Sequence, residues 1–559
     1  MNTIKSKAET HLSNIKSRTE EHLHNVLSAK SDIRQIHPDE AADDVELLAQ
    51  IGYKQELRRH YSTIQVFGIA FSIMGLLPSI ASTLSIGLEA GPAGLVWGWF
   101  LASVFIFCIG VSMSFLGSAI PTSGGLFYYS NYYAPESIRV PLSFLIGCSN
   151  SLGLIGGLCS ISYGFAVEIL SAVFIQRDGD FEITDGKCYG IFAACIVSNV
   201  VISCLTTKHA ATLQTISIVV NVFLVALFLI AVPVGFRHNS FNSAEYIFTN
   251  FENSRTSYST AWSFALSWMP AIWTIGAFDS AIHCSEEAKN AQKSIPWGIL
   301  GSISACWFLG WFIVIVCAAC IKDGDLASVL DSPTGSPMAQ IIYDALGKQW
   351  AVAFMALIAV GQYLMSVSIL IAASRQIWSF ARDDGLPVVY KFVKYVNPKI
   401  QVPVRATIFG GVIGLLLGLL VFVGPAGANA LFSLAVASNY LSWGTPVLLV
   451  LLPVGRKRFI SGPFHFGKML SNIINFATVC WILYVIVLCM FPDSKNVDKE
   501  TMNYTVVINV GIWLLSLFYY FVWGYRSYTG PRSNLDEQYF EGASLHEGID
   551  EILEEKASK

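Results

Sequence analysis

The most prominent pattern in the sequence is a series of long apolar runs separated by short polar segments. A helix needs roughly 20 apolar residues to cross the hydrocarbon core of a bilayer. Twelve runs have about this length, and each is expected to be helical because a helix pairs its own backbone groups in lipid. The predicted spans are approximately 63–84, 93–116, 142–173, 189–205, 213–234, 261–282, 295–321, 350–373, 406–423, 430–452, 473–491 and 506–523.

The composition agrees with this pattern. Hydrophobic residues make up 53% of the 559 residues and charged residues 13%, whereas a soluble domain carries about 25% charged residues. The net charge of -4 is small, and no basic stripe suggests nucleic-acid binding. We therefore predict an all-α polytopic membrane protein with an N-terminal tail (1–60), a transmembrane domain (61–525) and an acidic C-terminal tail (526–559).

The loops predict how this domain is oriented. Those on the side of the tails carry fourteen lysines and arginines, against eight on the opposite side. Because cytoplasmic loops carry the excess of basic residues, both tails are expected to be cytoplasmic. The plasma membrane and the vacuolar membrane both remain open, and the tails are candidate segments for binding trafficking factors.

The sequence offers little sign of soluble-enzyme chemistry. Most of the twelve cysteines lie inside apolar runs, where a buried thiol is a small hydrophobe and not part of a disulfide or metal site. A Walker loop, an HExxH motif and a GxSxG elbow are all missing from the sequence. We predict a protein that is not an enzyme, needs no cofactor, and draws its energy from an ion gradient or facilitates diffusion.

Two predicted spans are interrupted. The first contains Gly75 and Pro78, and the sixth contains Pro270 and Gly276. These spans occupy corresponding positions if the first ten form two five-helix repeats, and such a pair marks a midplane binding site. An unwound turn leaves N–H groups that can hold a carboxylate, and carbonyl groups that can hold a cation. Simple proline kinks are the alternative.

These breaks and the polar residues inside spans give the candidate substrate-binding residues. Asn439 is a further polar candidate inside a span, and helix-to-helix hydrogen bonding is the alternative role for such residues. The substrate-binding set is Ser72, Ile73, Met74, Gly75, Asn150, Trp273, Thr274, Gly276, Phe278 and Asp279.

Two acidic residues lie inside predicted spans, where charge is costly and usually functional. Asp279 and Glu168 are the candidate proton-coupling residues. Each could instead lie at the end of its span, and His283 is expected to be an interfacial histidine. The rings of Trp273 and Phe278 could make cation–π contacts with an amine or serve only in packing.

Three loop motifs resemble those of the amino acid–polyamine–organocation superfamily. They are PTSGGLFY at 121–128, SEEAKNAQKSIP at 285–296 and SRQIWSFARDDGLP at 374–387. Within that superfamily, residues 47–530 are similar to the fungal amino-acid/choline branch and its GABA permeases, notably FGIAFSIMGLLPS at 67–79 and WTIGAFDS at 273–280.

The resemblance implies two inverted five-helix repeats with broken helices one and six, plus two extra helices. It also implies proton-coupled transport of 4-aminobutyrate (GABA) or a related small amine. The turn at 72–75 would hold the substrate carboxylate, and the break at 273–279 would complete the pocket. Thiamine, choline or a polyamine on the same fold remain alternative substrates, and a nutrient receptor that does not transport is the alternative of another class.

Overall fold

The computed structural model describes residues 42–205, 207–253, 256–397, 399–492, 495, 497 and 502–532. The chain divides into two compact units, His60–Pro531 and the segments on either side of it. In the smaller unit, helix α2 (Ala42–Gln50) is described. Most of both tails, including the acidic C-terminal segment considered for trafficking factors, lies outside the described residues.

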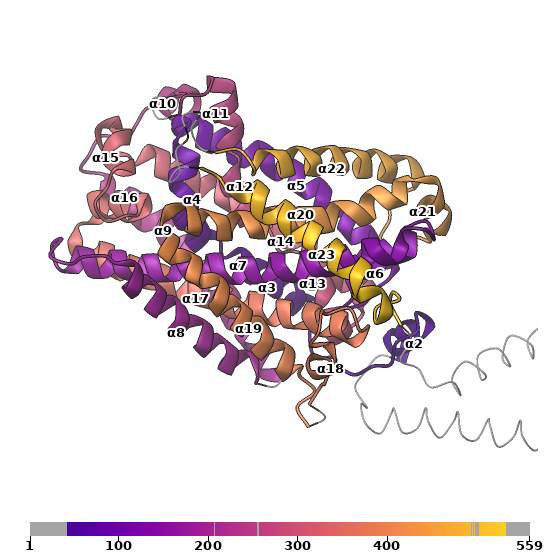
Figure 1. Cartoon of the computed structure of the whole chain (residues 1–559). Helices are drawn as coiled ribbons and strands as arrows, with labels where there is room; N and C mark the ends of the chain where they lie inside the picture. The colour runs from indigo at the N-terminus through magenta and orange to yellow at the C-terminus, as the bar shows by residue number, and fades with distance from the viewer. Residues whose placement is uncertain are drawn as a thin grey trace, which may run out of the picture. The chain divides into compact units, whose positions relative to one another are not determined.

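The described part of His60–Pro531 is helical and contains no strand (Figure 1). Its longer helices are α3 (Thr63–Met74), α4 (Leu76–Leu88), α5 (Gly91–Ala119), α7 (Arg139–Gln176), α8 (Asp185–Ser203), α9 (Thr207–Phe236), α14 (Ala291–Ala319), α17 (Lys348–Arg382), α19 (Val404–Gly418), α20 (Pro425–Leu451), α22 (Lys468–Leu488) and α23 (Thr505–Val522). The shorter ones are α6 (Gly125–Tyr133), α10 (Ala244–Thr249), α11 (Thr260–Leu266), α12 (Met269–Thr274), α13 (Ser280–His283), α15 (Leu326–Leu330), α16 (Pro337–Leu346), α18 (Tyr390–Val393) and α21 (Pro453–Arg458), and the 3₁₀ turns are η1 (Ser285–Glu287), η2 (Lys322–Gly324), η3 (Leu419–Val423) and η4 (Gly524–Arg526).

The predicted polytopic architecture is confirmed. Within the described residues, eleven helical segments are long and apolar enough to cross a membrane. They match eleven of the twelve predicted spans, with ends shifted by a few residues. The remaining span, predicted at 261–282, consists of the short helices α11, α12 and α13 and so has no single long helix.

Both predicted helix breaks are present. Between α3 and α4, Gly75 adopts a left-handed conformation (φ 36°, ψ 67°), which glycine reaches without a steric penalty. Pro78 lies in the first turn of α4, where its missing N–H breaks no helical hydrogen bond. In the second break, α12 ends at Thr274 and α13 begins only at Ser280, while Ala277 between them has a φ of 54°.

Helices at corresponding positions in the two halves pack against each other. The contacting pairs are α4 with α12, α5 with α14, α7 with α17, and α8 with α19. In each pair, the two helices hold the same place in the order of the first five and the second five spans. This pairing is what two repeats related by an approximate two-fold axis produce, and α22 and α23 are the additional helices.

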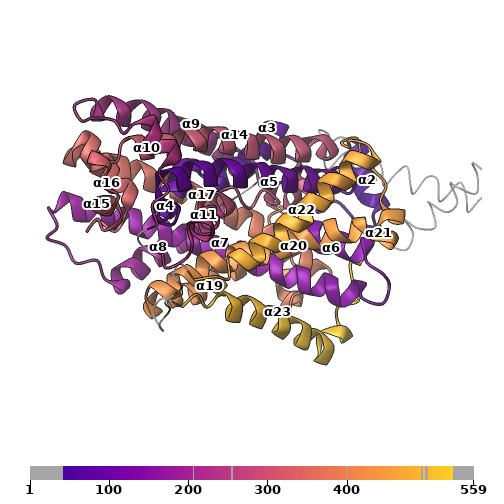
Figure 2. The ribbon, with the colours of Figure 1, turned by 90° about the horizontal axis from the view of Figure 1, so that it is seen from above.

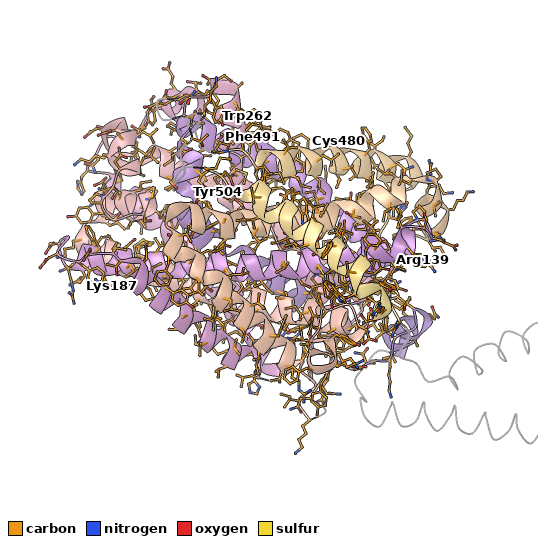
Figure 3. All side chains as sticks on the ribbon, viewed as in Figure 1. Arg139, Lys187, Trp262, Cys480, Phe491 and Tyr504 are labelled. Carbon is orange, nitrogen blue, oxygen red and sulfur yellow. The ribbon has the colours of Figure 1, made fainter. Side chains whose placement is uncertain are left out.

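The two ends of this unit differ. Figures 1 and 2 both place α10, α15 and α16 at one end, here called the distal face, and α6 and α21 at the other, the proximal face. The chain enters the unit at the proximal face, where the backbone N–H groups of His60 and Tyr61 donate to the Glu287 carbonyl. In Figure 3, Arg139 and Lys187 are labelled near these opposite ends.

Some helix pairs approach closely because a glycine faces a large ring. Gly310 of α14 lies against the indole of Trp99 of α5, and a Cβ at residue 310 would come within 2.1 Å of that ring. Trp99 is buried and donates from Nε1 to the Trp307 carbonyl at 3.1 Å, so it has little freedom to move. Small residues at such contacts let membrane helices pack closely.

We expect Gly310→Ala to destabilise the helix bundle by about 1–3 kcal/mol, the usual cost of overpacking a core. The measurement is the thermal unfolding midpoint of the purified protein in detergent. Gly511→Ala in α23 is the matched control, because a Cβ there meets nothing within 4 Å. Equal midpoints for the two variants would contradict the packing argument.

Candidate functional site

Two cavities lie along the middle of the unit. The smaller, here called the inner cavity, has a volume of about 40 Å³ and lies between the two helix breaks. The larger, the distal vestibule, has a volume of about 510 Å³ and extends from α12 to loops of the distal face. Trp273 and Val436 line both cavities. These two side chains therefore stand at the boundary between the vestibule and the inner cavity.

The inner cavity is lined by both broken spans and by α7, α17 and α20. Its wall is mostly apolar, with a few polar and aromatic side chains, as is usual for small-molecule sites. Its lining residues are Ile73, Ser79, Gly157, Ile161, Ile272, Trp273, Thr274, Gly276, Ala277, Met365, Ile369, Ala435, Val436, Asn439, Tyr440 and Trp443.

The α3/α4 break approaches this cavity but is covered by a methionine. A Cβ built on Gly75 would lie 1.9 Å from the Met365 sulfur, so the thioether occupies the place that a side chain at residue 75 would need. The Ser79 hydroxyl donates to the Met74 carbonyl at 2.6 Å, which satisfies one carbonyl that the break leaves without a helical partner. Met365 is flexible and polarisable, which suits a side chain that covers a binding position.

The second break joins the cavity to a buried polar cluster. Asn150 Nδ2 of α7 donates to Asn439 Oδ1 (3.2 Å), which lines the cavity, and to Asp279 Oδ2 (3.0 Å), which does not. Asp279 Oδ2 also lies 3.3 Å from His283 Nε2. All four side chains are at least 95% buried. A polar path therefore leads from the inner cavity to the Asp279–His283 pair.

The tautomer of His283 follows from its other contact. Its Nδ1 lies 3.1 Å from the Ser123 carbonyl oxygen, which can only accept a hydrogen bond, so we infer that Nδ1 carries a hydrogen. A hydrogen bond between Nε2 and Asp279 Oδ2 then needs one further proton, held by either atom. Asp279 Oδ1 has no hydrogen-bond partner among the described residues. One proton between Asp279 Oδ2 and His283 Nε2 therefore completes the hydrogen bonds of this pair.

The proximal side of this pair is closed by buried ion pairs. Arg382 Nη1 lies 3.1 Å from Glu286 Oε2, and Arg375 Nε lies 2.6 Å from Glu287 Oε1. Glu286 also accepts the Ser123 backbone N–H at 3.0 Å. These contacts join η1, the end of α17 and the loop before α6. Buried ion pairs therefore lie on the proximal side of the Asp279–His283 pair, whereas on the distal side the inner cavity and the vestibule share Trp273 and Val436 in their walls.

Glu168 is in a different place. It lies on α7 at the wall of the distal vestibule, is 3% exposed, and neither carboxylate oxygen has a hydrogen-bond partner among the described residues. It does not line the inner cavity. Of the two acidic residues considered for proton coupling, Glu168 therefore lines the distal vestibule, whereas Asp279 is buried behind the wall of the inner cavity.

The candidate residues separate into two groups. Ile73, Trp273, Thr274 and Gly276 line the inner cavity. The other candidates do not line the cavity. The Ser72 hydroxyl contacts Ser217 of α9, and the Phe278 ring packs on the Trp443 ring with 4.5 Å between centroids. The remaining four are buried and are absent from the cavity wall: Met74, Gly75, Asn150 and Asp279. Asp279 and His283 are both fully buried, so neither side chain is exposed at a membrane interface.

Sequence reasoning missed much of the wall. Met365 and Ile369 of α17, and Tyr440 and Trp443 of α20, were not among the candidates. One signal was present: positions 436, 439, 440 and 443 have the spacing of a single helix face. The spacing shows that these residues share one face of α20, but the cavity that this face lines depends on how α20 packs against the other helices.

Known proteins with related sequences agree with this architecture. The family described as amino acid permease matches residues 61–512. A GABA-specific permease of Saccharomyces cerevisiae is 50% identical over 93% of this chain and 91% of its own length. An uncharacterized amino-acid permease of Schizosaccharomyces pombe is 34% identical over 92% of each chain, and a putative polyamine transporter of Candida albicans is 29% identical over 90% of this chain and 92% of its own length.

A bundle of membrane-spanning helices with two central breaks, and a sequence match over nearly all of that bundle, lead to one assignment. The protein is an integral membrane transporter and not an enzyme, and the chain belongs to the amino acid permease family.

Proposed function

We propose that this permease is a secondary transporter that carries GABA together with a proton. The observation that carries the proposal is the polar path from Asn439 in the inner cavity through Asn150 to the Asp279–His283 pair. It connects the cavity between the two helix breaks to a pair that can hold a proton, and a solute the size of GABA would need the inner cavity, which is about 40 Å³, to open further. The 50% identity to a GABA-specific permease supports GABA as the solute.

GABA carries a carboxylate and an ammonium group, and each needs a partner. No lysine, arginine or histidine is among the described residues that line the inner cavity. The carboxylate would therefore be met by backbone N–H groups in the first turn of α4, which have no helical partner. That position opens when Met365 moves away from Gly75.

The ammonium end faces the other wall. Thr274 and Asn439 supply oxygens there, and the rings of Trp273, Tyr440 and Trp443 can hold a cation over their faces. Tyr440 and Trp443 are already in ring contact at 4.9 Å between centroids. In this proposal the two charged ends of an ω-amino acid bind different walls, the carboxylate at the α4 turn and the ammonium group at the aromatic wall.

The Asp279–His283 pair is the proposed proton site. Proton binding there changes the charge directly behind Asn150, and Asn150 contacts the cavity through Asn439. Release of the proton toward the proximal side would restore the original charge of the pair, and with it the original hydrogen bonds from Asn150 to Asp279 and Asn439. The charged neighbours are Glu286 with Arg382 and Glu287 with Arg375, so an opening of these ion pairs would let water reach the pair.

The described conformation corresponds to one stage of alternating access. The vestibule is present on the distal side, and the buried ion pairs close the proximal side. If the tails are cytoplasmic, as the basic loops indicate, this is an outward-facing conformation in the plasma or vacuolar membrane. Transport would then run from the distal face to the cytoplasm.

Uptake by the purified protein in liposomes tests the proposal. With an imposed inward proton gradient, we expect labelled GABA to accumulate, and a protonophore to abolish the accumulation. Unlabelled choline, thiamine and putrescine serve as competitors, because the putative polyamine transporter among the relatives makes a polycation a specific alternative. Gradient-driven uptake of putrescine without uptake of GABA would overturn GABA as the substrate and leave proton-coupled transport as the mechanism.

We expect Asp279→Asn to lower gradient-driven uptake at least about tenfold, because an amide cannot take up the coupled proton. Exchange of internal for external GABA without a gradient should be retained. Asp178→Asn is the control, since this exposed carboxylate pairs with Lys348 and neither residue lines either cavity. Unchanged uptake kinetics in Asp279→Asn would sink the proton assignment.

We expect Gly75→Ala to weaken GABA binding by about tenfold, which corresponds to about 1.4 kcal/mol. Its Cβ would press on Met365 and fill the α4 turn that the carboxylate needs. Gly467→Ala is the control for a Cβ at a positive φ without a packing clash, because Gly467 meets nothing within 4 Å. Its backbone conformation (φ 82°, ψ 160°) disfavours a side chain more than that of Gly75 does, so backbone strain alone would not give the larger effect at residue 75. Equilibrium binding of labelled GABA measures both, and retained affinity in Gly75→Ala would count against the carboxylate position.

A further inference from the structure

The distal vestibule contains a buried acid that the proposed transport cycle does not yet use. Glu168 is 3% exposed, and both of its carboxylate oxygens are buried without a hydrogen-bond partner among the described residues. An ionised carboxylate removed from water costs several kcal/mol unless a counter-charge or hydrogen bonds compensate it. Its place on the wall of a cavity of about 510 Å³ leaves room for a ligand to supply that compensation.

The charge of the vestibule favours a cationic ligand. Its described lining contains the acidic residues Glu89 and Glu168 and no lysine, arginine or histidine. Glu89 already has an interaction partner, so Glu168 is the acid whose charge the vestibule can offer to a ligand. A cleft lined by charge of one sign and walled by apolar groups focuses the field and raises the local concentration of the opposite ion. Cations are therefore drawn to the distal vestibule before they reach the inner cavity.

Aromatic rings form the wall beside Glu168. Tyr163, one helical turn and a residue before it on α7, lies edge-on to Phe432 of α20 with 6.4 Å between ring centroids. Phe432 in turn lies 5.0 Å from Trp273, the residue that also lines the inner cavity. The faces of such rings attract an ammonium group. A carboxylate and three connected rings thus lead from the vestibule to the boundary with the inner cavity.

We propose that the distal vestibule is a second binding site, separate from the inner cavity, which takes a primary ammonium group with the Glu168 carboxylate as its counter-ion. This proposal rests on the proposed function in one respect, that the amine bound in the vestibule is also the transported solute. GABA would dock there through its ammonium end and then pass Trp273. Neither cavity has a basic side chain in its described lining. The vestibule would therefore select the amine through Glu168, and the inner cavity would select the amino acid through the backbone N–H groups of the α4 turn.

A probe that carries only the amine separates the two sites. n-Butylammonium has the carbon chain and ammonium group of GABA but no carboxylate, so it fits the vestibule and lacks the group that the α4 turn would hold. We expect it to bind the purified full-length protein in calorimetry and to inhibit GABA uptake without being transported.

The variant is Glu168→Gln, which keeps the shape and removes the charge. Its matched control is Glu245→Gln, an exposed acid in the first turn of α10 on the same distal face. We expect the Kd of n-butylammonium, and its inhibition constant in uptake, to rise about tenfold in Glu168→Gln and to stay unchanged in Glu245→Gln. Butyrate, which has only the carboxylate, should show no difference between wild type and Glu168→Gln.

The outcomes separate this site from the proposed function. If wild type takes up GABA but Glu168→Gln binds n-butylammonium as wild type does, the vestibule site is overturned and the transport proposal stands. If wild type takes up no GABA but binds n-butylammonium in a Glu168-dependent way, the transport proposal is overturned and the vestibule site stands. If Glu168→Gln abolishes gradient-driven accumulation and leaves n-butylammonium binding intact, Glu168 carries a coupled proton and the ammonium site is overturned.

Discussion

The pairing of backbone polar groups in lipid is the constraint on which the rest of this structure depends. A helix can leave its hydrogen-bonding pattern inside a membrane only where protein or a polar cavity takes the place of water. The turns at Gly75 and at residues 275–279 meet this condition because α7, α17 and α20 surround them. The same enclosure that permits the breaks also creates the cavity between them, so the proposed binding site and the fold have one physical origin.

The packing of corresponding helices gives this enclosure its symmetry. Each of the first four spans contacts its counterpart in the other half, and the two breaks meet near the centre of that arrangement. Close approach between α5 and α14 depends on a residue without a side chain at Gly310, opposite the buried ring of Trp99. Rigid contacts of this kind let one group of helices move against another as a body, which alternating access requires.

Buried charge is arranged in three different ways along the pathway. Near the proximal face, Glu286 and Glu287 are compensated by arginines in direct ion pairs. At the second break, Asp279 accepts a hydrogen bond from Asn150 and lies 3.3 Å from His283 Nε2, and Asp279 and His283 are the groups proposed to exchange the proton. In the vestibule, Glu168 has no described partner at all. From the proximal to the distal side, the buried carboxylates thus go from ion-paired, through hydrogen-bonded to a histidine, to having no described hydrogen-bond partner. The proposed roles follow the same order: closure of the proximal side, proton binding and ammonium binding.

The sequence by itself determined the spans, the two breaks and the family, because each depends on local properties: the length of an apolar run, the conformational freedom of Gly75 and short motifs in loops. It also identified Trp273, Thr274 and Gly276, which follow directly from the second break. Only the tertiary structure decided that Met365 covers Gly75, that Asn150 links Asp279 to Asn439, and that Glu168 lies in a separate cavity. Those contacts join helices far apart in the chain, and the periodicity of one helix fixes which residues share a face but not which neighbour that face meets.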